Sequence, residues 1–269
     1  MKMLAWGAAV VLLCLCVSGA ALAADRWINY TAGSSVCAIA CEGERYVWCG
    51  GSGGVARFDI TTGQKVVYTK ADGLADNDVR AIAIDTNDNK WFGTLGGVSV
   101  LHADGSWTTY NTDNSRLADN WVQAVAVDAD ANKWFGTDEG GVSVLHAEGT
   151  WATYNADNSG LASDYVRAIA IGPDGNKWFG TDGGGASVLH PDGTWTTYNP
   201  ANSGLSDSRV CAIAIDATGN KWFGTDEGGV SVLRPDGSNL GFNQPVALSR
   251  RRADDRSGQF AESGPGRHS

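Results

Sequence analysis

Apolar and polar residues alternate along this chain in a pattern that recurs. One unit begins with Val166–Ile171, in which large and small apolar residues alternate. A segment without a polar face predicts a strand covered on both sides. A second apolar segment, Lys177–Thr181, surrounds a tryptophan and is followed by Asp182-Gly183-Gly184. Glycines there supply the positive φ of a tight turn, so the two segments and the turn predict the start of an antiparallel sheet.

The same unit contains two further strand signals. Ala186–His190 is again apolar, and the turn Pro191-Asp192-Gly193 separates it from Thr194–Tyr198. The last segment alternates apolar and polar residues, which is typical of an outer strand with one face in water. Each unit therefore predicts four short antiparallel strands.

The unit repeats with a nearly fixed period. Lys-Trp-Phe-Gly occurs four times, and the degenerate copy Val47-Trp48-Cys49-Gly50 precedes them. The tryptophans of the five copies are Trp48, Trp91, Trp134, Trp178 and Trp222, which are 43, 43, 44 and 44 residues apart. A unit of about 40 to 45 residues made only of short strands has the length of one propeller blade. We therefore predict an all-β fold, a β-propeller of five four-stranded blades, in which these tryptophans pack between blades.

The two ends of the array predict how the ring closes. The fifth unit has Ser238–Phe242 where the other units have Trp-Thr-Thr-Tyr or Trp-Ala-Thr-Tyr, while Trp27–Thr31 precedes the first unit with the spacing of Trp195 to Tyr198. We expect the N-terminal strand to complete the last blade and close the ring. A truncated array is the alternative. Cys37 and Cys211 hold equivalent positions, so a disulfide between them would require closure.

Three regions differ in composition. Lys2 precedes an apolar run over residues 4–17, and small residues follow at Ala21-Leu22-Ala23, which predicts a signal peptide over residues 1–24. The propeller is assigned to residues 25–242. Residues 243–269 contain Arg250-Arg251-Arg252 and few apolar residues, which predicts a disordered Arg-rich tail. We expect a periplasmic or extracellular (secreted) protein whose mature chain does not insert into a membrane.

The charge and the motifs limit the function classes. A net charge of -10 disfavours nucleic acid, because phosphates require basic surfaces. His102, His146 and His190 repeat at one spacing, but equivalent positions in a ring lie too far apart to bind one metal ion. The chain has no Gly-x-Ser-x-Gly motif and no phosphate-binding glycine loop. We expect neither a metal nor a cofactor.

One pattern resembles a known family. Gly-Leu-x-x-x-x-Val-x-x-Ile-x-x-Asp followed by Trp-x-Gly-Thr-x-x-Gly-Gly, as over residues 73–97 and 204–229, resembles the two-component regulator propeller repeat. The resemblance covers about residues 33–237. In that family the repeats form extracytoplasmic sensor portions of hybrid histidine kinases and also occur in free-standing exported proteins. The resemblance implies a propeller and ligand recognition, but not signalling by this polypeptide.

Residues that differ between the units predict a recognition face. In a propeller, the connections from second to third strand and from fourth to first strand emerge around the channel mouth. Here these connections carry residues that vary from blade to blade within a repeated frame. The candidate ligand-binding residues are Arg80, Trp121, Gln123, Tyr165, Arg167, Arg209, Asp138, Asp182 and Asp226. Neutral drift at exposed positions would give the same variation, so both interpretations remain open.

The candidate residues favour a carbohydrate or protein ligand. Trp121 and Tyr165 offer rings for stacking, and the arginines offer donors to carboxylates or sugar hydroxyls. The leading hypothesis is an exported, non-catalytic propeller that recognises a ligand on one face. The first alternative is a lyase or glycosidase at the channel mouth, since paired carboxylates such as Asp138 and Asp182 are the groups that glycoside hydrolysis uses. The second alternative is a purely structural repeat scaffold.

Overall fold

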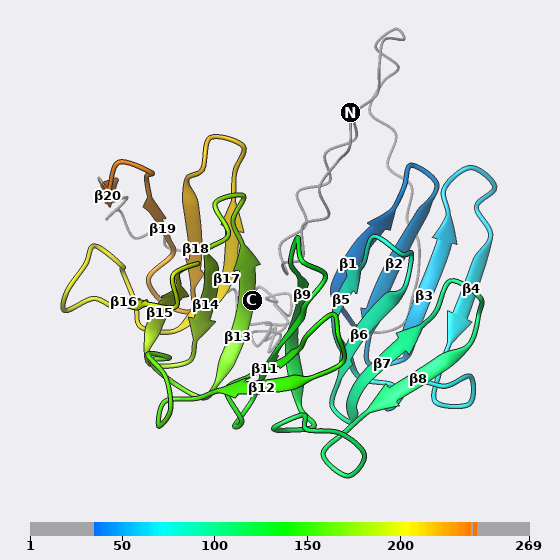
Figure 1. Cartoon of the computed structure of the whole chain (residues 1–269). Helices are drawn as coiled ribbons and strands as arrows, with labels where there is room; N and C mark the ends of the chain where they lie inside the picture. The colour runs from blue at the N-terminus through cyan, green and yellow to red at the C-terminus, as the bar shows by residue number, and fades with distance from the viewer. Residues whose placement is uncertain (1–34, 238, 241–269) are drawn as a thin grey trace, which may run out of the picture.

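The fold is all-β and contains five antiparallel four-stranded sheets (Figure 1). The computed structural model describes residues 35–237 and 239–240. The predicted signal peptide, the predicted tail and Trp27–Thr31 lie outside the described residues. Within each sheet the strands follow chain order, as expected for propeller blades.

The strands of the first three blades match the predicted units. Blade 1 contains β1 (Val36–Glu42), β2 (Tyr46–Gly51), β3 (Gly54–Asp59) and β4 (Lys65–Tyr68). Blade 2 contains β5 (Val79–Ile84), β6 (Lys90–Thr94), β7 (Gly97–Leu101) and β8 (Trp107–Tyr110). Blade 3 contains β9 (Val122–Val127), β10 (Lys133–Thr137), β11 (Val142–Leu145) and β12 (Trp151–Tyr154).

The last two blades continue the pattern, with a short final strand. Blade 4 contains β13 (Val166–Ile171), β14 (Lys177–Thr181), β15 (Gly185–Leu189) and β16 (Trp195–Tyr198). Blade 5 contains β17 (Val210–Ile215), β18 (Lys221–Thr225), β19 (Val230–Leu233) and β20 (Asn239–Leu240). The described residues of the outer strand of blade 5 are Asn239–Leu240, where the sequence lacks the Trp-Thr-Thr-Tyr segment.

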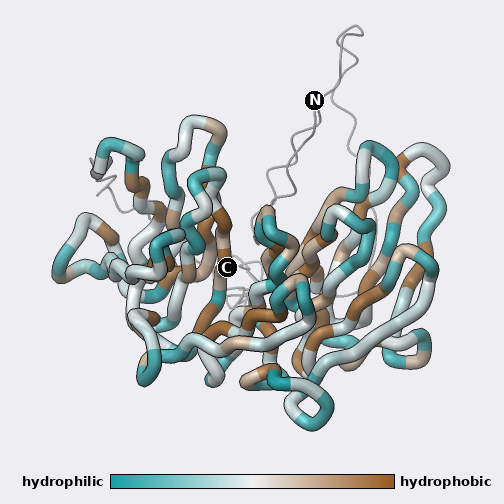
Figure 2. The backbone as a smooth tube through the Cα atoms, viewed as in Figure 1, coloured by the Kyte–Doolittle hydropathy of each residue, from teal (hydrophilic) through white to brown (hydrophobic). Residues whose placement is uncertain are grey.

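Successive blades pack side by side through their inner strands. β1 packs on β5, β5 on β9, β9 on β13 and β13 on β17, whereas β17 and β1 lack comparable packing within the described residues. Blades 1 and 5 lie on opposite sides of the view in Figure 1, so the described blades form an open arc. Apolar residues concentrate along the strands and polar residues in the connections (Figure 2). Closure of the ring stays a prediction.

The repeated tryptophans pack between blades, as predicted. Trp134 lies 6.0 Å from the ring of Phe179 in the next blade and 6.1 Å from Tyr154 in its own outer strand. The ammonium group of Lys177 lies 5.6 Å from the Trp134 ring centroid, within cation–π range. Equivalent contacts join the other three pairs of neighbouring blades. The same aromatic contacts therefore recur at all four interfaces between neighbouring blades.

A glycine two residues after the tryptophan lets blades 1 to 4 each approach the next blade closely. A Cβ atom on Gly136 would lie 2.7 Å from Cγ1 of Val166, which starts the next inner strand. Gly50, Gly93 and Gly180 have the same relation to a valine of the following blade. At Gly224 of blade 5 the nearest atom would be 3.4 Å away and belongs to Ala212 of the same blade.

The two end faces of the arc expose residues that are buried in the other blades. Val36 is 47% exposed, while Val166 at the equivalent position is fully buried. Trp222 is 39% exposed against 4% for Trp134, and Val230 is 49% exposed. Each end face therefore carries one half of the interface that recurs inside the arc.

Carboxylates in the turns between first and second strands hold the tryptophans. Oδ2 of Asp128 accepts a hydrogen bond of 2.9 Å from Nε1 of Trp134, and its Oδ1 accepts from the backbone N–H of Asn132. The carboxylate therefore bonds both the backbone of its turn and the tryptophan. Gly172 replaces the carboxylate in blade 4, and Nε1 of Trp178 is a buried donor without a partner in the described part of the chain.

These turns predict a loss of stability in acid. The hydrogen bond from Trp222 holds the pKa of Asp216 well below its usual range, and bonds from Asn89 and Trp91 lower the pKa of Asp85 although burial raises it. A depressed folded-state pKa adds stability that is present above the unfolded pKa, near 3.8, and is lost as the pH falls through the folded value. We expect urea midpoints to be equal at pH 7 and 5 and lower at pH 3. Asp216→Asn should reduce that fall, and equal midpoints at pH 7 and 3 would refute the prediction.

Candidate functional site

The predicted site residues lie where two sets of connections meet. The backbone N–H of Asp138 donates to the carbonyl of Trp121 at 3.0 Å, and the N–H of Asp182 donates to the carbonyl of Tyr165 at 2.9 Å. Asp226 and Arg209 are joined in the same way at 3.1 Å. The residue before each inner strand is therefore fixed beside the turn between second and third strands.

Buried side chains hold these connections in place. Oγ of Ser143, which is fully buried in β11, accepts a hydrogen bond of 2.9 Å from the N–H of Ala118. Oδ2 of Asp119 accepts from the N–H of Glu139 at 3.1 Å. The connection is thus bonded to both the third strand and the turn, so the side chains at this face project from rigid elements.

Three candidate residues, one on each of three neighbouring inner strands, line the same hollow. Arg80, Gln123 and Arg167 occupy the second position of β5, β9 and β13 and line this open hollow. Alanine, valine and isoleucine side chains of the same strands and of β1 form the rest of its wall. The hollow is therefore lined by both apolar side chains and cationic and amide groups.

Each arginine is paired with a carboxylate. Nε of Arg80 lies 2.8 Å from Oδ1 of Asp78. Arg167 donates from Nε to Oδ2 of Asp182 at 2.9 Å, and its Nη2 contacts the same oxygen. Nη1 of Arg209 lies 3.1 Å from Asp226. The fold thus neutralises part of the charge of these arginines with neighbouring carboxylates.

The amide of Gln123 replaces the guanidinium in blade 3. Its Nε2 donates to Oδ1 of Asp138 at 3.3 Å. Blade 3 therefore keeps the hydrogen bond to the turn carboxylate but leaves the carboxylate charge uncompensated by this residue.

The two predicted aromatic residues are exposed at the face. Trp121 is 51% exposed and Tyr165 is 43% exposed. The Tyr165 hydroxyl lies 3.5 Å from Oε1 of Glu139, and that carboxylate raises the pKa of the phenol. Both rings can therefore contact a molecule arriving from solvent.

The face carries more negative than positive charge. We define the mouth cluster as the nine candidate residues and their carboxylate neighbours Asp78, Glu139 and Glu227. Its three arginines and six carboxylates give a net charge of -3. Those three neighbours were not among the candidates, although two of them directly follow a candidate aspartate in the same turn.

The histidines and cysteines form no metal site in the described chain. Nδ1 of His190 lies 2.8 Å from Oδ1 of Asn176, and His102 and His146 contact the equivalent asparagines. No group of three His, Cys, Asp or Glu side chains in the described residues has metal-binding geometry. Cys37, Cys41, Cys49 and Cys211 are free thiols, so the disulfide that closure would permit is not formed.

Solved structures similar to this one include extracellular domains of two-component and one-component systems. The extracellular domain of a hybrid two-component system of B. thetaiotaomicron is 28% identical, with a TM-score of 0.62 over 73% of this chain and 26% of that one. The extracellular domain of a one-component system of the same organism is 21% identical, with a TM-score of 0.67 over 81% of this chain and 32% of that one. These similarities support a propeller fold for this chain. No protein-family model and no curated protein matches the chain.

The similarity has a limited extent. This chain spans about a third or less of the length of the sensor domains it matches. Virginiamycin B lyase from Staphylococcus aureus is 17% identical, with a TM-score of 0.61 over 76% of this chain and 68% of that one, a likeness that shows the fold alone. Among the described residues there is no helix with the length and apolar character needed to cross a membrane.

Proposed function

We propose that this protein is an exported, non-catalytic propeller that recognises a hydroxyl-rich glycan with its mouth cluster. The observation that carries the proposal is the convergence of paired arginine and carboxylate groups with exposed aromatic rings on one rigid face. The similarity to extracellular domains of two-component and one-component systems supports an exported location.

The pairing of the arginines favours hydroxyl groups over carboxylates as ligand. A guanidinium has five N–H donors and a carboxylate has several lone pairs, so an ion pair retains both donors and acceptors. A sugar hydroxyl donates and accepts, and can bond both partners of the Arg167–Asp182 pair without displacing either. An anionic ligand would instead approach a cluster of net charge -3.

The exposed rings supply the apolar half of such a site. Aromatic side chains present large rigid faces with little entropy to lose on binding. Trp121 and Tyr165 precede the inner strands of neighbouring blades, so one extended ligand can contact both. The same features would suit a protein ligand with neutral polar side chains, which is the second form of recognition compatible with this cluster.

The propeller is proposed to close into a five-bladed ring in the exported protein. Val36 at one end face and Gly224 at the other are equivalent to the valine and glycine that meet between all neighbouring blades. Closure would bury the exposed Val36, Trp222 and Val230 side chains, and apolar burial is favourable by about 25 cal/mol per Å². Closure would also bring Arg209 of blade 5 toward blade 1 and complete the mouth.

Affinity electrophoresis tests the ligand chemistry. Native gels would contain either a neutral polysaccharide, such as xyloglucan or a mixed-linkage glucan, or polygalacturonate. We expect the neutral polysaccharides to retard the protein and polygalacturonate to leave its mobility unchanged, because the mouth cluster repels uronates. Stronger retardation by polygalacturonate, or none in any of a broad set of gels, would overturn the proposal.

A further inference from the structure

One turn of the mouth cluster carries two carboxylates without a cationic partner in the described part of the chain. Asp138-Glu139-Gly140-Gly141 joins β10 to β11. Oδ1 of Asp138 accepts a hydrogen bond from the amide of Gln123 at 3.3 Å, and Oε1 of Glu139 lies 3.5 Å from the Tyr165 hydroxyl. Neither carboxylate forms an ion pair within the described residues. The negative charge of this turn is therefore uncompensated.

Blade 5 contains the same turn together with a cation. Asp226-Glu227-Gly228-Gly229 joins β18 to β19. The guanidinium of Arg209 bridges its two carboxylates, with Nη1 3.1 Å from Oδ2 of Asp226 and Nη2 3.0 Å from Oε1 of Glu227. An Asp-Glu-Gly-Gly turn thus presents two carboxylates at a separation that one cationic group can bridge.

The backbone around the two turns is held in the same way, and one residue differs. In blade 5, the carboxylate of Asp207 accepts hydrogen bonds from the N–H groups of Arg209 and of the turn glutamate, at 3.2 and 3.0 Å. In blade 3, Asp119 accepts from the N–H groups of Trp121 and of the turn glutamate, at 3.2 and 3.1 Å. Blade 3 therefore has an indole where blade 5 has the guanidinium.

Two exposed aromatic residues border the blade 3 turn. Trp121 is 51% exposed, and Tyr165, which reaches the turn from blade 4, is 43% exposed. The pKa of the Tyr165 phenol is raised chiefly by Glu139 and further by Asp138, so both carboxylates lie near its hydroxyl. A cation is attracted both by carboxylates and by the face of an aromatic ring, most strongly by that of tryptophan.

We propose that Asp138, Glu139, Trp121 and Tyr165 form an ammonium subsite, which binds the free amine of an amino sugar within the recognised glycan. The inference rests on the proposed recognition of glycans by the mouth cluster and names the class of sugar. An ammonium group has three N–H donors and no acceptor, which suits carboxylate oxygens that retain free lone pairs. The neighbouring Arg167–Asp182 pair would bind hydroxyl groups of the same glycan.

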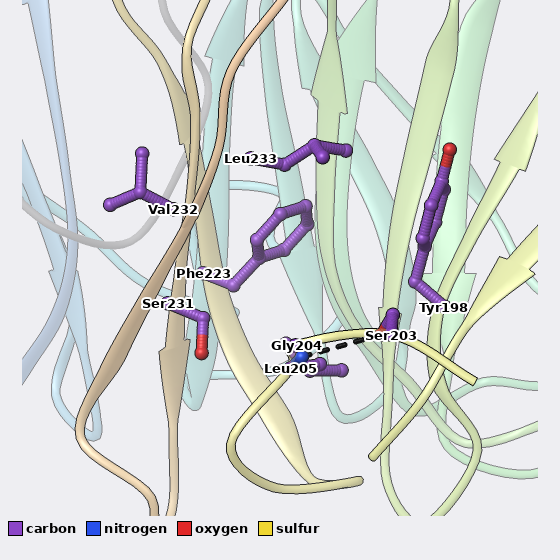
Figure 3. Close-up of a pocket in the computed structure, with 8 residues that line it drawn as sticks. All are labelled: Tyr198, Ser203, Gly204, Leu205, Phe223, Ser231, Val232 and Leu233. Carbon is purple, nitrogen blue, oxygen red and sulfur yellow. Dashed lines mark hydrogen bonds between the residues drawn. The ribbon is translucent and has the colours of Figure 1, made fainter. Parts of the chain in front are cut away.

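Other places in the described structure suit a ligand cation less well. The hollow along the inner strands carries Arg80 and Arg167, which oppose a further positive charge. The opening between blades 4 and 5 is lined by uncharged side chains such as Tyr198, Phe223 and Leu233 (Figure 3). Calcium requires many oxygen ligands, and no group of three His, Cys, Asp or Glu side chains in the described residues has metal-binding geometry.

Isothermal titration calorimetry with three matched tetrasaccharides tests the subsite. Cellotetraose, tetraglucosamine and N-acetylated tetraglucosamine share one backbone and differ only in the group at C2. The titrations would use physiological ionic strength, which screens general attraction to the acidic protein, and a mildly acidic pH at which the amines are protonated. We expect tetraglucosamine to bind about tenfold more tightly than either of the others.

Variants assign this preference to the turn. Asp138→Asn/Glu139→Gln should reduce the affinity ratio of tetraglucosamine to cellotetraose to less than about twofold. Trp121→Arg, which gives blade 3 the cation found in blade 5, should reduce it similarly. Asp130→Asn/Glu148→Gln makes the same change of charge on the opposite face of blade 3 and should leave the ratio at about tenfold.

Each contrary outcome overturns a defined claim. Equal binding of tetraglucosamine and cellotetraose, or equally tight binding of the N-acetylated form, would overturn the ammonium subsite and leave glycan recognition standing. No binding of any tetrasaccharide would overturn both. Equal loss of the preference in the two double variants would show general attraction to an acidic protein and overturn the subsite. Tetralysine bound as tightly as tetraglucosamine, with the same dependence on the variants, would overturn the amino-sugar assignment in favour of a protein ligand.

Discussion

Trp134→Ala is expected to cost about 3 to 5 kcal/mol of unfolding free energy, the range for buried tryptophan truncation. The side chain is 4% exposed and contacts Tyr154, Phe179 and Lys177. Truncation would open a cavity between blades 3 and 4 and remove the hydrogen bond to Asp128, a buried carboxylate. The change would be measured as the shift of the urea unfolding curve followed by far-UV circular dichroism.

Trp222→Ala is the matched control for this substitution. Trp222 makes the same hydrogen bond to Asp216 but is 39% exposed and has no described blade after it. After closure its neighbour would be Cys49, because blade 1 has cysteine where the other blades have phenylalanine. We expect less than half the loss seen for Trp134→Ala. Equal losses would show that the phenylalanine of the next blade adds nothing to the stability that the repeated tryptophan provides.

Gly136→Ala is expected to cost about 1 to 3 kcal/mol, the range for overpacked cores. The added methyl group would lie 2.7 Å from Cγ1 and 3.1 Å from the carbonyl oxygen of Val166. Blade 3 and blade 4 would have to separate, and that separation would propagate to the aromatic contacts beside it. The same urea unfolding measurement reports the loss.

Two other glycine substitutions serve as comparisons for this prediction, one as a neutral control and one as a test of closure. A Cβ atom on Gly53 would meet no described atom within 4 Å, and the residue has no positive φ, so Gly53→Ala should change stability by less than about 0.5 kcal/mol. Gly224→Ala reports on closure, because its methyl group meets Val36 only in a closed ring. We expect Gly224→Ala to be as costly as Gly136→Ala, and a neutral result would contradict closure.

Much of the fold was predictable because each repeat carries the apolar pattern and the turn residues that define its four strands. The strand bounds predicted for blade 4 lie within one residue of those of β13, β14, β15 and β16. They were predicted from the all-apolar inner strand, the glycine turns and the tryptophan period. The packing of the tryptophans followed from repetition, since equivalent positions can meet only the neighbouring blade. The relation between blades 1 and 5 did not follow, because it depends on the angle at each interface rather than on any residue pattern.

The face that carries the candidate site could be predicted from the sequence, but the pairing of its charged side chains could not. Variation within a repeated frame located Trp121 and Tyr165, which the structure exposes. The pairing of Arg80 with Asp78, two residues apart in sequence, depends on side-chain direction at the start of β5.

A glycan-array comparison of three proteins tests the central claim most directly. The parent would be compared with Trp121→Ala/Arg167→Ala and with Arg45→Ala, which removes an arginine paired with Asp59 in a turn on the opposite face. We predict that the parent and Arg45→Ala bind the same neutral glycans and that the double variant loses at least tenfold in signal. Binding retained by the double variant, or no glycan bound by the parent, would contradict recognition of glycans by the mouth cluster.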